Sequence, residues 1–96
     1  MNKSAPELLK EATKILEDRG KIRDSEGGER SMADCIDSFN NITKNTLSET
    51  DGWLFMILLK LARSKQGGFH EDDFLDIIGY SALMAESAIG ENHDNT

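Results

Sequence analysis

The chain has 96 residues and a formal net charge of −7, with 11 Lys and Arg residues against 18 Asp and Glu residues. This length suffices for one domain and leaves no room for a second hydrophobic core. An acidic chain gains no free energy from the release of counterions on DNA, so we expect no direct binding to duplex DNA. The single cysteine, Cys35, cannot form an internal disulfide, and we expect a half-buried thiol in a reducing compartment.

The longest apolar run, residues 53–59, is much shorter than the ~20 residues that a membrane-spanning helix needs. The N-terminal residues lead directly into an amphipathic segment and do not have the pattern of a secretory signal. The sequence therefore predicts a cytoplasmic protein without a membrane partner.

The first predicted helix begins at Ser4 and ends at Gly20. Ser4 and Glu7 have the spacing of a capping box, in which each side chain accepts a hydrogen bond from the other residue's backbone N–H. Apolar residues recur on one face of this segment at helical spacing. They are Leu8, Ala12, Ile15 and Leu16. Residues 20–30 contain three glycines and show no periodicity, which predicts a charged loop.

The second predicted helix is capped by Ser31 and loses its pattern near Asn45. Its apolar stripe consists of Met32, Ile36, Phe39 and either Ile42 or Cys35. The third predicted helix begins at Ser48 and runs to about Lys65. Its middle is apolar on every side, and three amphipathic neighbours of this length can barely cover such a helix. We therefore expect the chain to form a homo-oligomer.

The fourth predicted helix begins near His70 with acidic residues that suit a helix N-terminus, and it ends at Gly90. Its apolar residues are Phe74, Ile77, Ile78, Ala82, Met84 or Ala85, and Ile89. Residues 91–96 are expected to be a disordered polar tail, which leaves residues 1–90 as a single domain. With no strand pattern in the sequence, the predicted fold is all-α: a compact bundle of about four helices around a central hydrophobic helix.

The start of the fourth predicted helix offers candidate metal ligands. Asp73 and Asp76 lie three residues apart and Asp72 and Asp76 four, so each pair shares a helix face and provides two carboxylates for one Mg²⁺. In the alternative interpretation, these acids complement the helix dipole and Asp76 forms an ion pair with Lys60 or Arg63.

Cations gather around the predicted glycine-containing loop, where arginines and a helix N-terminus form a plausible cradle for an anion. The candidate phosphate-binding residues are Arg19, Lys21, Arg23, Arg30 and Ser31, together with Lys60 and Arg63 of the third predicted helix. The segment is not a Walker loop, because no Gly-Lys-Ser/Thr follows the glycines. The alternative interpretation is a charged, solvated loop. His70 and His93 lack partners at metal-ligand spacing, and Trp53 and Tyr80 are expected to pack in the core. No catalytic residue is assigned.

Several stretches of the sequence together form a recognisable pattern: Arg19-Gly20-Lys21, residues 28–32, Phe39-Asn40, residues 47–56, Lys60-x-Ala62-Arg63, Asp72-Asp73-Phe74-x-Asp76 and Tyr80-x-Ala82-Leu83. These stretches resemble a family of phage and prophage proteins catalogued as a domain of unknown function of the DUF6378 type. The Lys-x-Ala-Arg, Asp-x-x-Asp and Tyr pattern is also similar to the C-terminal half of MazG-like helical domains. The resemblance implies a viral accessory protein that acts in the cytoplasm of a bacterial host.

The first functional hypothesis is a binding protein. A small acidic helical chain without a complete catalytic set suits a factor that docks on a host protein and inhibits a defence complex that binds nucleic acid, in the manner of anti-CRISPR proteins. Acidic side chains would then imitate phosphates toward a basic groove. These are Glu71, Asp72, Asp73 and Asp76. This function needs no cofactor.

The alternative hypothesis is MazG-like, Mg²⁺-dependent nucleotide binding or nucleotide pyrophosphohydrolysis. Asp73 and Asp76 would hold Mg²⁺, while Lys60, Arg63 and the loop between Arg19 and Arg30 would hold the phosphates. The Glu-Glu-x-x-Glu run that MazG-like hydrolases carry on a facing helix is absent from this sequence. A third possibility is an oligomeric structural protein held together by its third helix.

Overall fold

The structure is a computed structural model that describes residues 2–23 and 31–94, with side chains described for residues 2–20 and 31–92. It consists of α1 (Ala5–Arg23), α2 (Ser31–Thr43), α3 (Glu49–Gln66) and α4 (Glu71–Asp94). The described residues include no strand, so the predicted all-α bundle is confirmed. None of the described helices is long and apolar enough to cross a membrane.

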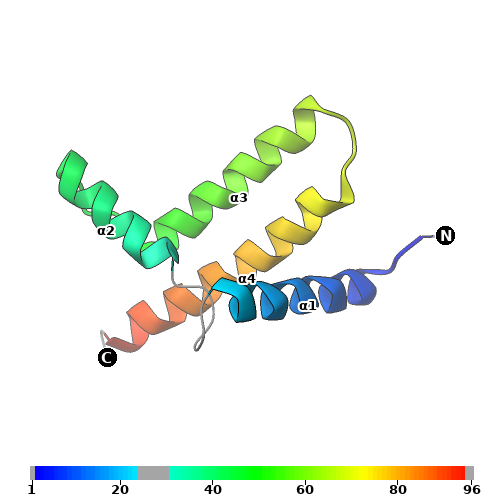
Figure 1. Ribbon diagram of the computed structural model, residues 1–96, viewed down its shortest axis with the longest axis horizontal. Helices are drawn as coiled ribbons and strands as arrows, with labels where there is room; N and C mark the ends of the chain where they lie inside the picture. The colour runs from blue at the N-terminus through cyan, green and yellow to red at the C-terminus, as the bar shows by residue number, and fades with distance from the viewer. Residues whose placement is uncertain (1, 24–30, 95–96) are drawn as a thin grey trace.

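Two antiparallel helices, α3 and α4, form the centre of the bundle (Figure 1). On this pair, α1 packs against α4 and α2 packs against α3. Figure 1 shows α2 beside the end of α3 where α3 begins, well away from most of α1. The arrangement is open, with a radius of gyration of 14.8 Å where a compact chain of this length is expected to have about 12.5 Å.

The hydrophobic core is small. It lies mainly between α4 and the two helices that pack on it, α1 and α3. Trp53 of α3 is 2% exposed and stacks on Tyr80 of α4, with 5.7 Å between the ring centroids. Ala12 of α1 and Leu75 of α4 are also buried, at 3% and 6% exposed. The predicted core position of Trp53 is confirmed, whereas Leu75 was not among the apolar residues predicted for this helix.

The apolar residues of α2 contribute less to the core than predicted. Ile36 is buried against α3, but Phe39 and Ile42 are 44% and 80% exposed, because α2 contacts only one neighbouring helix. Cys35 is exposed as well, so the expectation of a half-buried thiol is wrong.

The outward face of α3 remains uncovered within one chain. Leu54, Phe55, Leu58 and Leu61 are between 41% and 65% exposed. The three other helices therefore do not cover the hydrophobic helix on every side.

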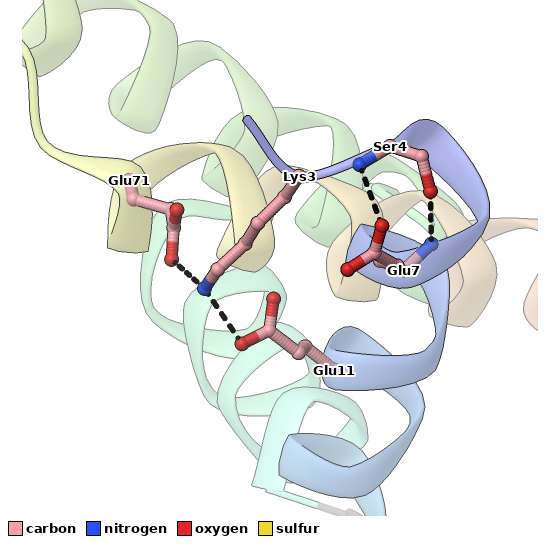
Figure 2. Close-up of polar contacts among 5 residues, drawn as sticks. All are labelled: Lys3, Ser4, Glu7, Glu11 and Glu71. Atoms are coloured by element: carbon pink, nitrogen blue, oxygen red, sulfur yellow. Dashed lines mark hydrogen bonds and ion pairs between the residues drawn. The ribbon is translucent and has the colours of Figure 1, made fainter. Parts of the chain in front are cut away.

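Two capping boxes are present, of which the sequence predicted the first. Ser4 and Glu7 exchange two hydrogen bonds of 3.2 Å at the start of α1 (Figure 2), and Ser48 and Asp51 exchange hydrogen bonds of 2.9 Å and 3.2 Å at the start of α3. The predicted end of the first helix at Gly20 is wrong, because α1 continues to Arg23. An interior glycine costs a helix only about 1 kcal/mol, which neighbouring residues can offset.

The expected tail from residue 91 is also partly helical, since α4 continues to Asp94. The Glu91 carboxylate accepts a hydrogen bond of 2.8 Å from the Thr50 hydroxyl of α3, and the Asn92 side chain donates one of 2.9 Å to the Ala88 carbonyl. The first of these contacts joins the last turns of α4 to the start of α3.

Candidate ligand pocket

A pocket of about 750 Å³ lies between α1, α3 and α4, near the turn that joins α3 to α4. Most of the side chains around it are charged or polar. The residues that line it are Ile15, Arg19, Lys60, Arg63, Gln66, Gly67, His70, Asp72, Asp73, Leu75 and Asp76.

Helical spacing and antiparallel packing bring these side chains together. Lys60 and Arg63 lie one turn apart on α3, and Asp73 and Asp76 lie one turn apart on α4, so each pair shares a helix face. The two helices run in opposite directions from the turn at Gly67 and Gly68, and Gly68 adopts a φ of 81° there, a conformation that glycine tolerates. The last turns of α3 therefore face the first turns of α4.

Asp76 is held by two cations at the pocket wall. Its Oδ2 atom lies 2.9 Å from Lys60 Nζ, and its Oδ1 atom accepts a hydrogen bond of 3.2 Å from the Arg19 guanidinium. The Asp76 side chain is 11% exposed, that of Lys60 is 15% exposed and that of Arg19 is 42% exposed. The predicted ion pair between Asp76 and Lys60 is therefore present, and Arg19 is a second partner that the sequence did not reveal.

Asp73 is shielded to a similar extent, with its side chain 12% exposed, and its Oδ1 atom is 4.0 Å from Lys60 Nζ. Lys60 thus lies between the two carboxylates on which the sequence analysis placed a metal. Arg63, by contrast, lines the pocket without an ion pair to any residue that the structure describes. Among the described residues, the pocket thus has one cation without an ion pair, Arg63, and two that are shared with Asp76.

The carboxylates fit Mg²⁺ only in part. Across residues 2–23 and 31–94, no group of three or more His, Cys, Asp or Glu side chains has the geometry to hold a metal ion. Two carboxylates are nevertheless a usual protein contribution to Mg²⁺, which keeps several waters and takes further oxygens from substrate phosphates. The residues therefore suit a Mg²⁺ ion that arrives with phosphates better than a metal cage made by the protein alone.

Of the other predicted phosphate-binding residues, only Ser31 has a side chain that the structure describes. Ser31 is the first residue of α2 and is exposed, away from the pocket lining. Lys21 and Arg23 lie in the last turn of α1, where side chains are outside the described set, and Arg30 lies outside the described residues altogether. Ile15, Gln66 and His70 line the pocket but were not predicted; only the position of His70, directly before the acidic helix start, offered a signal.

Glu71 belongs to a different cluster at the start of α4. Figure 2 shows Lys3 between Glu11 of α1 and Glu71, with Nζ at 2.8 Å and 2.7 Å from their carboxylate oxygens. These two hydrogen bonds raise the pKa of Lys3 above its ordinary value, and the bond to Glu11 has the larger effect. The cluster fastens the segment before α1 to α4, and Glu71 does not line the pocket.

Comparisons with known proteins bear on the origin of the chain. The Gene 55 protein of Mycobacterium phage D29 is 32% identical over 78 residues, which cover 80% of this chain and 50% of that protein. The chain thus spans about half the length of this curated relative. No solved structure gives a significant match. These findings confirm the predicted likeness to phage proteins, while the MazG-like part of the resemblance stays a prediction. Residues 7–88 match the family described as a domain of unknown function, DUF6378, and the chain belongs to that family.

Proposed function

We propose that this phage-type protein binds a nucleotide together with Mg²⁺ in the pocket between α1, α3 and α4. One observation carries the proposal: three cations and three carboxylates from three helices line the same pocket. They are Arg19, Lys60, Arg63, Asp72, Asp73 and Asp76. Phosphate groups and Mg²⁺ are the ligands that such a mixed set of charges recognises.

The size and lining of the pocket suit a ligand of this class. A volume of about 750 Å³ falls within the range of roughly 300–1,000 Å³ that is usual for sites of small molecules and cofactors. Arg63 offers a guanidinium fork, which matches two oxygens of one phosphate. Ile15 and Leu75 supply apolar surface on the side formed by α1 and α4.

Phosphate binding would exchange the partners of Asp76. A phosphate near Arg19 and Lys60 competes with Asp76 for both cations, and Mg²⁺ that enters with the phosphate provides a new positive partner for the carboxylate. Asp73, which is poorly hydrated and only 4.0 Å from Lys60, would turn to the same ion. In this scheme the ion pairs of the free protein keep the buried charges neutralised until the ligand arrives.

The test is isothermal titration calorimetry of the purified chain with each nucleoside triphosphate, with and without Mg²⁺. We expect binding that Mg²⁺ strengthens, and we expect Arg63→Ala to weaken it by about 10- to 100-fold, the loss of one charged hydrogen-bonding group. The matched control is Lys14→Gln on the exposed side of α1, which removes one positive charge outside the pocket. No binding of any triphosphate, or equal losses in both variants, would overturn the proposal.

Asp76→Asn separates the metal from the phosphate. The variant removes a metal ligand but also releases Arg19 and Lys60 from their carboxylate partner. We therefore expect Asp76→Asn to bind inorganic pyrophosphate more tightly than the wild type when Mg²⁺ is absent, and to lose the strengthening by Mg²⁺. Release of pyrophosphate from a triphosphate by the wild type, abolished in Asp76→Asn, would extend the proposal from binding to hydrolysis.

Inhibition of a host defence protein by phosphate imitation stays a prediction with less support from the geometry. Asp73 and Asp76 are 12% and 11% exposed in their side chains and face Lys60, while Glu71 is paired with Lys3. Among the four acids assigned to this surface, Asp72 alone is exposed and has no ion pair within the described residues. A basic groove would therefore meet little of the predicted negative surface.

A further inference from the structure

The side of α3 that faces away from α4 is a continuous apolar stripe. Leu54, Leu58 and Leu61 follow one another at spacings of four and three residues, and Phe55 lies beside them. Their exposed fractions are 45%, 53%, 41% and 65%, respectively. Apolar residues at spacings of four and three are typical of the contact face of paired helices. Neither α1, α2 nor α4 occupies this side of α3.

We propose that this stripe is covered by the same stripe of a second copy of the chain, with the two α3 helices antiparallel and Leu58 at the twofold axis. A twofold interface of this type uses one surface patch twice, so the patch has to be complementary to itself. The stripe meets this requirement because its interior is apolar and its two ends carry opposite charges.

The end charges decide the direction of packing. Asp51 lies seven residues before Leu58, and Lys65 lies seven residues after it, on the same side of α3. Antiparallel packing about Leu58 therefore places Asp51 of each copy next to the partner's Lys65. Within one copy, Asp51 and Lys65 lie about 21 Å apart along the helix. Parallel packing would place like charges opposite one another. Both residues are exposed, and Lys65 has no ion pair with any residue in the described ranges.

The exposed area of the chain agrees with a missing partner. The chain exposes 7192 Å², whereas a compact monomer of 10.7 kDa is expected to expose about 5,500 Å². The excess is larger than the roughly 800 Å² that each partner buries in an interface of standard size. A dimer through α3 would cover the largest group of exposed apolar side chains.

Sedimentation equilibrium tests the dimer. We expect the wild type to sediment as a dimer and Leu58→Lys, which brings two positive charges together at the axis, to weaken dimerisation at least ~10-fold. The matched control is Ile42→Lys at the end of α2, an apolar residue that is 80% exposed and lies off the stripe. Circular dichroism verifies that each variant keeps its helices. A monomeric wild type, or a Leu58→Lys variant that dimerises like the control, would overturn the proposal.

Cysteine cross-linking tests the antiparallel register in a Cys35→Ser background. Leu58→Cys is expected to form an intermolecular disulfide, because the two copies of residue 58 meet at the axis. Leu54→Cys is not expected to form a disulfide, because the two copies of residue 54 lie about 12 Å apart along the helices. A disulfide bridges a Cα separation of at most about 7 Å. Ready cross-linking through residue 54 and none through residue 58 would contradict this register. The result does not depend on nucleotide binding, since the stripe lies outside the pocket lining.

Discussion

Lys60 of α3 and Asp76 of α4 form an ion pair of 2.9 Å in which the two side chains are only 15% and 11% exposed. Removal of one charge from a shielded pair leaves the other without its partner in a poorly hydrated place. We expect Lys60→Met or Asp76→Leu alone to lower the free energy of unfolding by about 1–3 kcal/mol. The double variant Lys60→Met/Asp76→Leu is expected to be more stable than either single variant, as measured by urea denaturation.

A double-mutant cycle gives the control for this prediction. If the two single losses simply add up in the double variant, the pair does not interact as the geometry indicates. Arg19 remains in all three variants, and at 42% exposed its guanidinium keeps access to water when Asp76 is gone. A stable double variant that no longer binds a nucleotide would mean that the charges are kept for the ligand and not for the fold.

At Gly52 of α3, side chains of α2 come close to the helix backbone. A Cβ atom at this position would collide with the Met32 sulfur and would lie 3.0 Å from Ile36 Cδ1, both on α2. We expect Gly52→Ala to destabilise the protein by about 1–3 kcal/mol, because the Met32 and Ile36 side chains must shift to make room. Thermal unfolding followed by circular dichroism measures the effect.

Gly90→Ala is the matched control for Gly52→Ala. Gly90 also lies within a helix, but a Cβ atom there would meet nothing within 4 Å. The same substitution is therefore expected to stabilise α4 by about 0.5–1 kcal/mol through helix propensity alone. Equal effects of both variants would show that contact with α2 does not matter at Gly52.

Much of the fold could be predicted because helix starts are encoded locally. The capping residues Ser4, Glu7 and Ser48 sit where the helices begin. Phe39 and Ile42 of the predicted stripe are exposed for a reason that periodicity does not reveal. A helical stripe shows which side of a helix is apolar, but not whether a neighbouring helix extends far enough to cover it.

The pocket could be predicted only in part. The pairing of Lys60 with Asp76 follows from two helices of similar length joined by a short turn, and the sequence suggested it. The contact of Arg19 with Asp76 depends on how α1 crosses α4, which no local pattern determines. Arg19 was predicted as a phosphate ligand together with the loop that follows it, and it lines the pocket beside Lys60 and Arg63.

Glu7 provides a test by pH. The pKa of the Glu7 carboxyl is lowered below its ordinary value of 4.5, mainly by the hydrogen bond from the Ser4 backbone N–H and further by the Ser4 hydroxyl. Because the folded state favours the charged carboxylate, Glu7 stabilises the fold above the ordinary pKa, and this contribution disappears as the pH falls through the lowered pKa. Carboxyl-detected NMR is expected to show Glu7 titrating at lower pH than in an unfolded chain, and Ser4→Ala is expected to bring its pKa back toward 4.5. A Glu7 pKa that Ser4→Ala leaves unchanged would mean that the Ser4 hydroxyl does not contribute to the shift.

Trp53 is the most buried large side chain in the described part of the protein, and it joins α3 to α4 through its stack on Tyr80. Its indole N–H also donates a hydrogen bond of 3.2 Å to Glu49 one turn earlier. We expect Trp53→Ala to cost about 3–5 kcal/mol, a large share of the total stability of a domain this small. Tyr80→Phe keeps the stacked ring and is expected to change stability by no more than about 0.5 kcal/mol. Urea denaturation followed by circular dichroism compares the two, and a Trp53→Ala variant as stable as Tyr80→Phe would mean that the contact between α3 and α4 does not depend on this ring.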